Sequence, residues 1–435
     1  MSRTAIIVSP YFPPSTLAGV HRARHLAKHL PAAGWTPIVV CVDEAHHEER
    51  LDPGLASLVP PSVEVVKVGA LPACLTRPLG VGEISLRAWA PLRRALLRLL
   101  TTRSVSAMVI TGSPYYPMLL AREIKARFNV PVVLDFQDPW VSAWGASRPA
   151  ASKDGLSHRL ATLLEPRALR AADHITSVSA IQNSEMAARY PWLDRSRMSA
   201  IPIGGDREDF EHLRALEMAT VDPGNRRELV DLWYIGSFWP AAELPVRAIL
   251  RAVAMLRSQH PHVARRVRLN FVGTDATAGG NTCHIRKIAE EEGAGAHVRE
   301  KPSRLPYLAA LGLMARADGI LLIGSVEPHY TASKIYPALM SGRPFLSLFH
   351  ASSSSHQILA AAGGGIAHSF RSAAELDSLV PELAKSLSRL VQAPEPLGSV
   401  DPRAYAPYEA RAIAARYAQI FDSIALRCEP VARLA

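Results

Sequence analysis

Short apolar runs alternate with amphipathic stretches along the first 205 residues. Most of these runs are continuously apolar, which is typical of strands whose sheet is covered on both faces. Helical spacing between them predicts helices over Val20–Ala32, Pro117–Phe128 and Ala180–Arg189. The predicted strands are Ile6–Val8, Ile38–Val42, Val63–Val68, Ala107–Ile110, Val132–Asp135, Ile175–Val178 and Met198–Ile201. This alternation predicts a parallel sheet wound on both sides over residues 1–205.

The pattern then breaks and restarts. A polar stretch containing "DPGNRRE" predicts an interdomain connection over 206–230, and a second doubly wound α/β domain is expected over 231–400. Its predicted strands are Leu232–Gly236, Leu269–Gly273, Ile320–Ile323 and Phe345–Phe349. Its predicted helices are Leu244–Ser258, Ile285–Glu292, Leu305–Arg316 and His356–Ala361.

The C-terminal segment, 401–435, is expected to hold one long helix at about Ala404–Leu426. Apolar residues at 413, 417, 420, 421 and 424 lie on one stripe of that helix. It follows a proline-rich stretch, and it must bury the stripe against another element. We predict that it packs back on the first domain.

Composition fits this two-domain class. A chain of 435 residues is too long for one ordinary core, and 48% hydrophobic residues suffice for two. No apolar run approaches the roughly 18 residues of a membrane span. The N-terminus enters a predicted strand at Thr4–Val8, in place of the longer apolar region of a secretory signal. Cys41, Cys74, Cys283 and Cys428 are widely scattered, which predicts reduced thiols and a cytoplasmic protein.

The chain is basic, with a formal net charge of +10. The sequence contains no nucleic-acid-binding motif and no interleaving of aromatic and basic residues, so we expect no nucleic-acid partner. Anionic substrates and an anionic membrane surface both remain compatible with the charge.

Six segments of the chain, in order, resemble those of family-four glycosyltransferases with the GT-B fold. They are the opening "IIVSPYFPPSTLAGVHRARHL", "LDFQDPW", "AADHITSVSA", "IPIGGDREDF", "LWYIGSFWP" and "SKIYPALMSGRP". The resemblance implies two Rossmann-like domains facing a cleft, with the acceptor in the first and a nucleotide-sugar donor in the second. It also implies a retaining transfer without a metal ion or other cofactor. The departing diphosphate needs positive charge and N–H donors, which helix N-termini and glycine-rich turns supply.

In the first domain, the resemblance directs attention to the turn after the first strand. Relatives carry a glycine pair there that approaches the sugar diphosphate; here Ala18-Gly19 remains, and an ordinary helix start is the alternative. Arg22, one turn into the helix, could reach phosphate or face solvent. His21, His25 and His29 share a helix face with zinc-like spacing, but no further ligand cluster accompanies them, so we predict no metal site. We assign only His21 to the ligand, as a catalytic candidate.

"FQDPW" follows a predicted buried strand, so Asp138 should emerge at the carboxyl end of the sheet. It could orient an acceptor hydroxyl, pair with a basic neighbour, or simply serve as a turn aspartate before Pro139. Relatives carry arginine at the position of Gln137, so one candidate charge is missing.

In the second domain, Gly236 and Ser237 occupy the first strand–helix turn. Many relatives have arginine after this glycine and a lysine a few residues later, near the position of Ala241–Glu243. Neither is present. Lys334, expected at a helix N-terminus, is a candidate replacement, and a solvated surface lysine is the alternative.

"SVEPHYTASKIYPALMSGRPFL" carries the rest of the donor site expected from the resemblance. Ser333 is the predicted N-cap of a helix that Gly342 ends, which places Pro337 in the first turn, where its missing N–H is tolerated. Glu327 matches the first glutamate of the family, a third catalytic candidate, but Pro337 stands where the ribose-binding glutamate is expected. The predicted donor-binding residues here are Tyr330, Thr331, Ala332, Ser333 and Lys334, with Gly273, Lys301, Pro302 and Tyr336 near the base or ribose.

A segment at 91–103, "PLRRALLRLLTTR", could form a basic amphipathic helix. Arg87, Arg94 and Arg98 would share one side, which suggests contact with a membrane surface. The alternative is an ordinary helix whose leucines pack on the sheet.

The sequence therefore predicts a glycosyltransferase that acts on a glycan or lipid-linked acceptor in surface or exported glycan synthesis. We expect it in the cytoplasm, with the inner membrane face as a candidate site. Two alternatives stay open: a sugar-nucleotide-binding protein with weakened catalysis, suggested by the missing Arg, Lys and Glu, and another GT-B activity such as a sugar-nucleotide epimerase.

Overall fold

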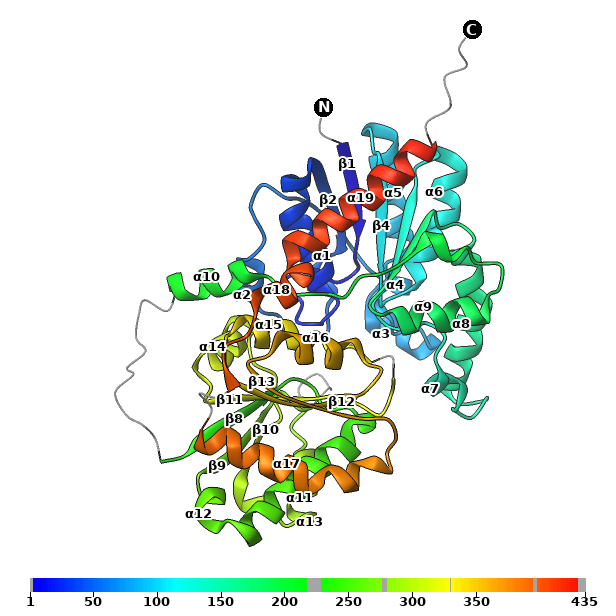
Figure 1. The fold of residues 1–435 in the computed structure, drawn as a ribbon. Helices are drawn as coiled ribbons and strands as arrows, with labels where there is room; N and C mark the ends of the chain where they lie inside the picture. The colour runs from blue at the N-terminus through cyan, green and yellow to red at the C-terminus, as the bar shows by residue number, and fades with distance from the viewer. Residues whose placement is uncertain (1–2, 217–227, 276–279, 329, 394–396, 429–435) are drawn as a thin grey trace. The chain divides into compact units, whose positions relative to one another are not determined.

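The computed structural model describes residues 3–216, 228–275, 280–328, 330–393 and 397–428 (Figure 1). The chain divides into two compact units. Unit 1 comprises Met1–Ile203 together with Ala410–Ala435, and unit 2 comprises Gly204–Glu409. The expected connection at 206–230 holds helix α10 (Arg207–Leu216), which belongs to unit 2, and residues 217–227, which lie outside the described residues.

The described part of unit 1 is built on a seven-stranded parallel sheet with the strand order β3-β2-β1-β4-β5-β6-β7. All strands run in the same direction, and the order in which they follow one another reverses between β1 and β4, as expected of a Rossmann-like domain. The strands are β1 (Arg3–Val8), β2 (Trp35–Val42), β3 (Glu64–Val68), β4 (Ala107–Gly112), β5 (Val132–Phe136), β6 (His174–Ser177) and β7 (Met198–Ala200).

Helices cover both faces of this sheet, which is why its strands are apolar throughout. Ile6 and Val8 of β1 face one core, and Ala5 and Ile7 face the other. The helices of unit 1 are α1 (Val20–His29), α2 (Pro53–Ala56), α3 (Ala73–Thr76), α4 (Ile84–Arg87), α5 (Trp89–Thr102), α6 (Leu120–Phe128), α7 (Ala143–Ala146), α8 (Lys153–Leu169), α9 (Ala180–Arg189) and α19 (Ala410–Cys428).

The C-terminal helix α19 lies against α1, as Figure 1 shows in red and blue. Its predicted stripe is buried: Ile413, Tyr417 and Phe421 are fully inaccessible. These side chains join the core formed by α1 and one face of the sheet. The predicted return of the last helix to the first domain is therefore confirmed.

Unit 2 repeats the architecture with a six-stranded parallel sheet in its described residues, in the order β10-β9-β8-β11-β12-β13. The strands are β8 (Val230–Ile235), β9 (Val267–Val272), β10 (Val298–Lys301), β11 (Gly319–Ile323), β12 (Phe345–His350) and β13 (Gly365–Phe370). Here the strand order reverses between β8 and β11.

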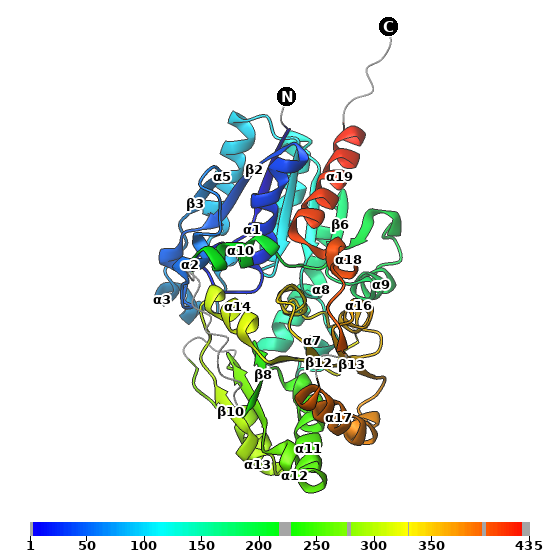
Figure 2. The same cartoon turned by 60° about the vertical axis from the view of Figure 1, so that its left-hand side comes forward.

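The helices of unit 2 also form two layers. Helices α11 and α17 run side by side in both views (Figures 1 and 2) and pack with α13 on one face, while α14, α15 and α16 cover the other. Their bounds are α11 (Glu243–Gln259), α12 (Pro261–Ala264), α13 (His284–Glu291), α14 (Tyr307–Arg316), α15 (Ile335–Met340), α16 (Ser354–Ala362), α17 (Glu375–Gln392) and α18 (Pro402–Tyr405).

The predicted basic face at 87–98 is wrong. Arg87 ends α4, whereas Arg94 and Arg98 belong to α5. Arg87 is buried and donates to the carbonyl oxygens of Leu71, at 3.0 Å, and His46, at 3.1 Å. Leu92, Leu96 and Leu100 of α5 are buried in the core. The alternative, an ordinary helix packing its leucines on the sheet, is correct.

Among the described residues, none of the helices combines the length and the apolar character needed to cross a bilayer. Cys41, Cys74 and Cys283 form no disulfide.

Candidate active site

Both sheets place the predicted site residues at their carboxyl edges. In open parallel sheets, ligands bind beyond the carboxyl ends of the strands where the strand order reverses. In unit 1 the loop after β1 carries Gly19 and the loop after β5 carries Asp138. In unit 2 the loop after β8 carries Gly236, and the loop after β11 runs from Gly324 to Lys334. Each unit therefore brings its own set of predicted residues to one place.

Gly19 is the N-cap residue of α1 and packs against the loop after β5. Its φ of −59° is open to any residue, so the backbone does not require glycine. A Cβ atom there would lie 3.4 Å from Gln137 Oε1. Gln137 Nε2 in turn donates to the Gly19 carbonyl oxygen at 3.4 Å. Gln137 is buried, and its Oε1 has no hydrogen-bond partner among the described residues. An unpaired amide oxygen thus lies beside the turn at which the resemblance places the sugar diphosphate.

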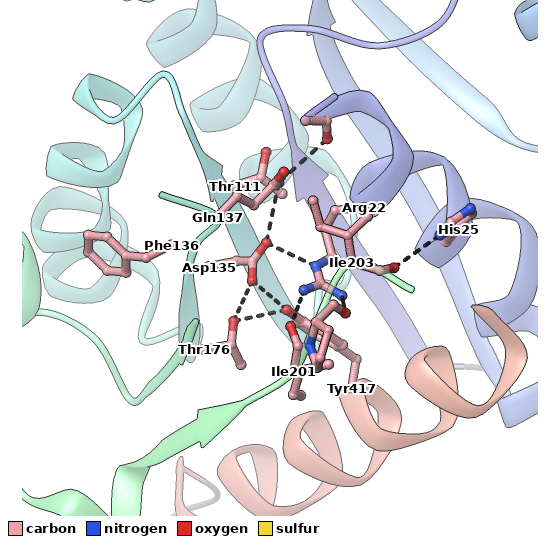
Figure 3. Close-up of polar contacts among 12 residues, drawn as sticks. Arg22, His25, Thr111, Asp135, Phe136, Gln137, Thr176, Ile201, Ile203 and Tyr417 are labelled. Carbon is pink, nitrogen blue, oxygen red and sulfur yellow. Dashed lines mark hydrogen bonds and ion pairs between the residues drawn. The ribbon is translucent and has the colours of Figure 1, made fainter. Parts of the chain in front are cut away.

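Beneath this turn, a buried network surrounds Asp135 at the end of β5 (Figure 3). Its carboxylate accepts hydrogen bonds from Arg22 Nε at 3.1 Å, Thr176 Oγ1 at 2.8 Å and the Tyr417 hydroxyl at 2.7 Å. All four side chains are inaccessible to solvent. Burial raises the pKa of the Tyr417 phenol well above its usual range, which keeps it a donor. The network joins α1, β5, β6 and α19 beneath the loops that carry Gly19 and Asp138.

Arg22 is committed to this network. Its guanidinium also donates to the carbonyl oxygens of Pro202, at 2.9 Å, and Ile201, and it stacks over the Tyr417 ring at 5.2 Å. The predicted solvent-facing alternative is wrong because Arg22 is fully buried. With its donors turned toward Asp135 and the chain at 201–202, Arg22 supports the site from below, and we no longer assign it to phosphate.

Asp138 emerges at the carboxyl end of β5, as the sequence predicts, and is exposed. Its backbone carbonyl accepts from the Tyr115 hydroxyl at 2.9 Å. Tyr115 stacks on Trp140 with ring centroids 5.3 Å apart. These contacts fix the backbone of the loop that carries Asp138.

His21 lies in the first turn of α1, next to Gly19. Its Nδ1 is 3.3 Å from Arg24 Nη2, and its ring is 5.9 Å from that of His25. Burial, with the neighbouring Arg24 charge, lowers the pKa of His21 to about 3. The imidazole is therefore neutral at ordinary pH and is suited to hydrogen bonding rather than to carrying a charge.

In unit 2, Gly236 meets Lys334. Gly236 has a φ of +140°, a backbone conformation that residues other than glycine rarely adopt. A Cβ atom at this position would lie 3.2 Å from Lys334 Nζ. The backbone therefore favours glycine here, and an added Cβ atom would also press on the lysine amine.

The Lys334 amine is buried, so the predicted solvated alternative is wrong. Its Nζ lies 3.8 Å from the centroid of the Tyr234 ring and has no hydrogen-bond partner among the described residues. Burial lowers the pKa of Lys334 to about 7. A buried amine of this kind is stabilised in its charged form as soon as an anion binds beside it.

The structure adds Arg304, which the sequence analysis did not identify. Its Nη2 donates to Ser237 Oγ at 3.0 Å. A Cβ atom on Gly273, whose φ is +76°, would lie 3.7 Å from Arg304 Cα and 4.0 Å from the Gly236 amide nitrogen. The guanidinium therefore reaches the side chain that occupies the position of the family's arginine. No sequence pattern indicated Arg304, because the strand that it follows, β10, was not predicted.

Lys301 and Pro302 take part through their backbone. The Lys301 carbonyl accepts from the Gly273 amide at 2.9 Å, and the Pro302 carbonyl accepts from the Asp275 amide at 3.1 Å. The Lys301 side chain is exposed. These bonds fix the turn after β9 against the end of β10, beside Arg304.

The loop after β11 is held by α16. The Tyr330 carbonyl accepts from Ser353 Oγ at 2.7 Å, and Thr331 Oγ1 lies 2.8 Å from Ser354 Oγ. Ala332, a predicted donor-binding residue, is buried, and its amide donates to Ser355 Oγ at 3.0 Å. We therefore remove Ala332 from the donor-binding residues. Glu327 is half-buried in the same loop, with its amide donating to Ser325 Oγ at 3.2 Å.

Helix α15 begins one residue later than predicted. Lys334, not Ser333, is its N-cap residue, and no side chain caps it. Pro337 is nevertheless in the first turn, and Gly342, with a φ of +69°, follows the helix as predicted. Tyr336 corrects the ribose assignment, because it is fully buried with its ring 5.7 Å from that of Tyr408. Its side chain belongs to the core of unit 2.

The sequence over residues 18–204 matches a family described as glycosyl transferase 4-like domain. The match includes Gly19, His21 and Asp138, so the first-domain candidates all lie within it. No curated protein sequence matches the chain.

Solved structures match the fold over nearly the whole length. HepE from Anabaena, in complex with UDP and glucose, is 13% identical and aligns over 97% of this chain and 100% of its own, with a TM-score of 0.57. WaaG, a glycosyltransferase involved in lipopolysaccharide biosynthesis, is 15% identical over 96% and 99%, with a TM-score of 0.57. The trehalose-6-phosphate synthase OtsA is 12% identical over 99% of each chain, with a TM-score of 0.63.

At these identities the structural matches establish the fold, which is GT-B. Together with the domain family, the fold identifies a glycosyltransferase of the GT-B type.

Proposed function

We propose that this transferase moves a sugar from a nucleotide-sugar to an acceptor hydroxyl, with retention of the anomeric configuration and without a metal ion. The acceptor is a glycan or a lipid-linked glycan in surface or exported glycan synthesis. The similar structures support this choice, since HepE was solved with UDP-glucose and WaaG is involved in lipopolysaccharide biosynthesis.

The observation that carries the proposal is the buried amine of Lys334, which lies against Gly236 and has no hydrogen-bond partner among the described residues. A buried amine without a hydrogen-bond partner is costly, and a bound anion compensates that cost. The amine lies where the strand order of the second sheet reverses, which is where such sheets bind ligands. Arg304 adds a second positive charge at Ser237, next to the same turn. This arrangement suits a diphosphate.

The chemistry follows from these charges. The bond between the anomeric carbon and the diphosphate oxygen breaks, and a bond from that carbon to the acceptor oxygen forms. The acceptor proton passes to the departing phosphate oxygen or to a carboxylate. Lys334 and Arg304 stabilise the negative charge that grows on the diphosphate, a role that a divalent cation fills in other enzymes. Asp138 orients the acceptor hydroxyl, neutral His21 hydrogen-bonds the sugar, and Glu327 contacts the donor.

The first test is slow hydrolysis of the donor by the purified chain. UDP-glucose, GDP-mannose and ADP-glucose are incubated with the protein, with and without EDTA, and release of nucleoside diphosphate is measured. We expect release from one donor, unchanged by EDTA, and a product sugar of the same anomeric form by NMR. Loss of turnover in EDTA would contradict the metal-independent mechanism.

A sugar-nucleotide-binding role with weakened catalysis is the second candidate. Three observations favour it: Ser237, Gln137 and Pro337 stand where relatives carry arginine, arginine and glutamate. Donor binding in calorimetry without turnover, even with added oligosaccharide acceptors, would assign this role. Release of nucleoside diphosphate would exclude it.

A further inference from the structure

Helix α8 presents an apolar stripe to solvent. Leu156, Leu160 and Leu163 follow the i, i+4, i+7 spacing of one helix face. Their exposed fractions are 55%, 41% and 59%. The opposite side of α8 carries the buried residues Ala161, Glu165, Ala168 and Leu169. The helix is therefore anchored by one face while leucines project from the other.

Basic residues flank this stripe. Arg159, Arg167 and Arg170 lie on the same side of α8 as the leucines by helical spacing, and all three are exposed. The acidic residues of the helix are elsewhere: Glu165 is buried and pairs with Arg189, and Asp154 lies toward the other side. The exposed face of α8 is thus apolar at its centre and positive at its margins.

An exposed tryptophan stands near each end of the helix. Trp144 of α7, which packs on the first turns of α8, is 53% exposed with Arg148 over its ring at 4.5 Å. Trp192 is 44% exposed, and Arg170 lies over its ring at 4.7 Å. Trp192 and Arg170 thus lie at the end of the leucine stripe, while α7, which carries Trp144, meets α8 at His158. Exposed tryptophan and arginine beside an apolar stripe are the combination found where proteins meet the headgroup region of a bilayer.

We propose that the α8 surface, defined as Trp144, Leu156, Arg159, Leu160, Leu163, Arg167, Arg170 and Trp192, docks unit 1 on an anionic lipid bilayer. The leucines enter the boundary between headgroups and acyl chains, and the arginines contact the lipid phosphates. A bilayer is favoured over a protein partner by this charge pattern, with positive margins around an apolar centre and with both acidic side chains of α8, Asp154 and Glu165, away from the leucines. The acidic residue beside this surface is Asp194, which shares a hollow with Arg170 and Trp192. The proposal is independent of the donor chemistry.

The test is co-sedimentation of the full chain with lipid vesicles. Wild-type protein should bind vesicles that contain phosphatidylglycerol, bind less at high salt, and hardly bind pure phosphatidylcholine. Leu156→Ser/Leu160→Ser/Leu163→Ser should lower the partition coefficient by about tenfold or more. Arg159→Ser/Arg167→Ser should lower it by about thirtyfold, since each arginine contributes about 1 kcal/mol.

The matched control is Arg94→Ser/Arg98→Ser, which removes two exposed arginines from α5. It should bind vesicles nearly as the wild type does. All variants change exposed side chains, so their thermal unfolding and donor hydrolysis should stay at wild-type values. Three results would overturn the proposal: no vesicle binding by the wild type, full binding by both α8 variants, or an equal loss in the α5 control. Concentration-dependent self-association that the leucine variant abolishes would instead assign the surface to a second copy of the chain.

Discussion

The Nζ atom of Lys334 lies over the ring of Tyr234, 3.8 Å from its centroid, with Gly236 beside it. The aromatic face gives the ammonium form some stabilisation, yet burial still lowers the pKa of the amine to about 7. The protonation of Lys334 is therefore sensitive to whatever binds next to it.

Binding of UDP should take up a proton through Lys334. Above about pH 7 the buried amine of the ligand-free protein is largely neutral, whereas a bound diphosphate favours the charged form and raises its pKa. At about pH 8.5 we expect uptake close to one proton per ligand, and weaker affinity than at pH 7. Calorimetry in two buffers of different ionisation enthalpy measures this uptake. Lys334→Met should abolish it, and an unchanged uptake in that variant would show that another group titrates.

Gly236→Ala should fold but bind the donor poorly. The added Cβ would lie 3.2 Å from Lys334 Nζ, and the φ of +140° strains any residue with a side chain. We expect a loss of about 1–3 kcal/mol in stability and a much larger loss of donor affinity. Gly342→Ala is the control, because Gly342 also has a positive φ but nothing lies within 4 Å of its added Cβ. Equal donor affinity in the two variants would separate Gly236 from the site.

Moving the guanidinium from position 304 to position 237 tests whether Arg304 binds the donor. Arg304→Ser should weaken donor binding by about 10- to 100-fold, the magnitude of one charge-assisted hydrogen bond. Adding Ser237→Arg returns a guanidinium to the same turn and should recover most of the affinity. Arg299→Ser, which removes an exposed arginine from the neighbouring strand β10, controls for the change in net charge. If the double variant binds no better than Arg304→Ser alone, Arg304 does not act at the donor.

The Asp135 network should contribute strongly to the stability of unit 1. Asp135→Asn leaves the buried Arg22 without its counter-charge, for which we expect about 3–5 kcal/mol of destabilisation. Tyr417→Phe removes one hydrogen bond and should cost about 0.5–1.5 kcal/mol. Asp422→Asn, on the exposed ion pair with Arg3, should cost at most about 1 kcal/mol. Urea unfolding measures all three, and equal effects of Asp135→Asn and Asp422→Asn would contradict the ranking.

The strands that carry the site could be predicted because they lie inside their sheets. β5 and β11 are buried on both faces, so their sequences are unbroken apolar runs. The two missed strands, β10 and β13, form the edges of the second sheet. β10 reads "VREK", in which Arg299 and Lys301 are exposed, and that pattern gives no signal of a buried strand.

Side-chain roles were harder to predict, because they depend on contacts between distant segments. The local sequence of Arg22 is that of a surface arginine, yet Asp135, 113 positions away, makes it a core residue. Tyr336, two residues after Lys334, was itself assigned to the base or ribose, but its place in α15 turns it inward. Helix α8 was not predicted, for a different reason. Its buried face and its leucine stripe lie on opposite sides, so the sequence lacks the single apolar face that periodicity detects.

The return of α19 to unit 1 has a consequence for how the protein is made. During synthesis residues 1–203 emerge before unit 2, but Tyr417 and Phe421, which complete their core, leave the ribosome only after all of unit 2. Until then Asp135 lacks one of its donors, and the apolar groups beside α1 stay uncovered. Unit 2, in contrast, is complete by residue 409. A premature stop at that position would therefore damage the first half of the protein while leaving the second half intact.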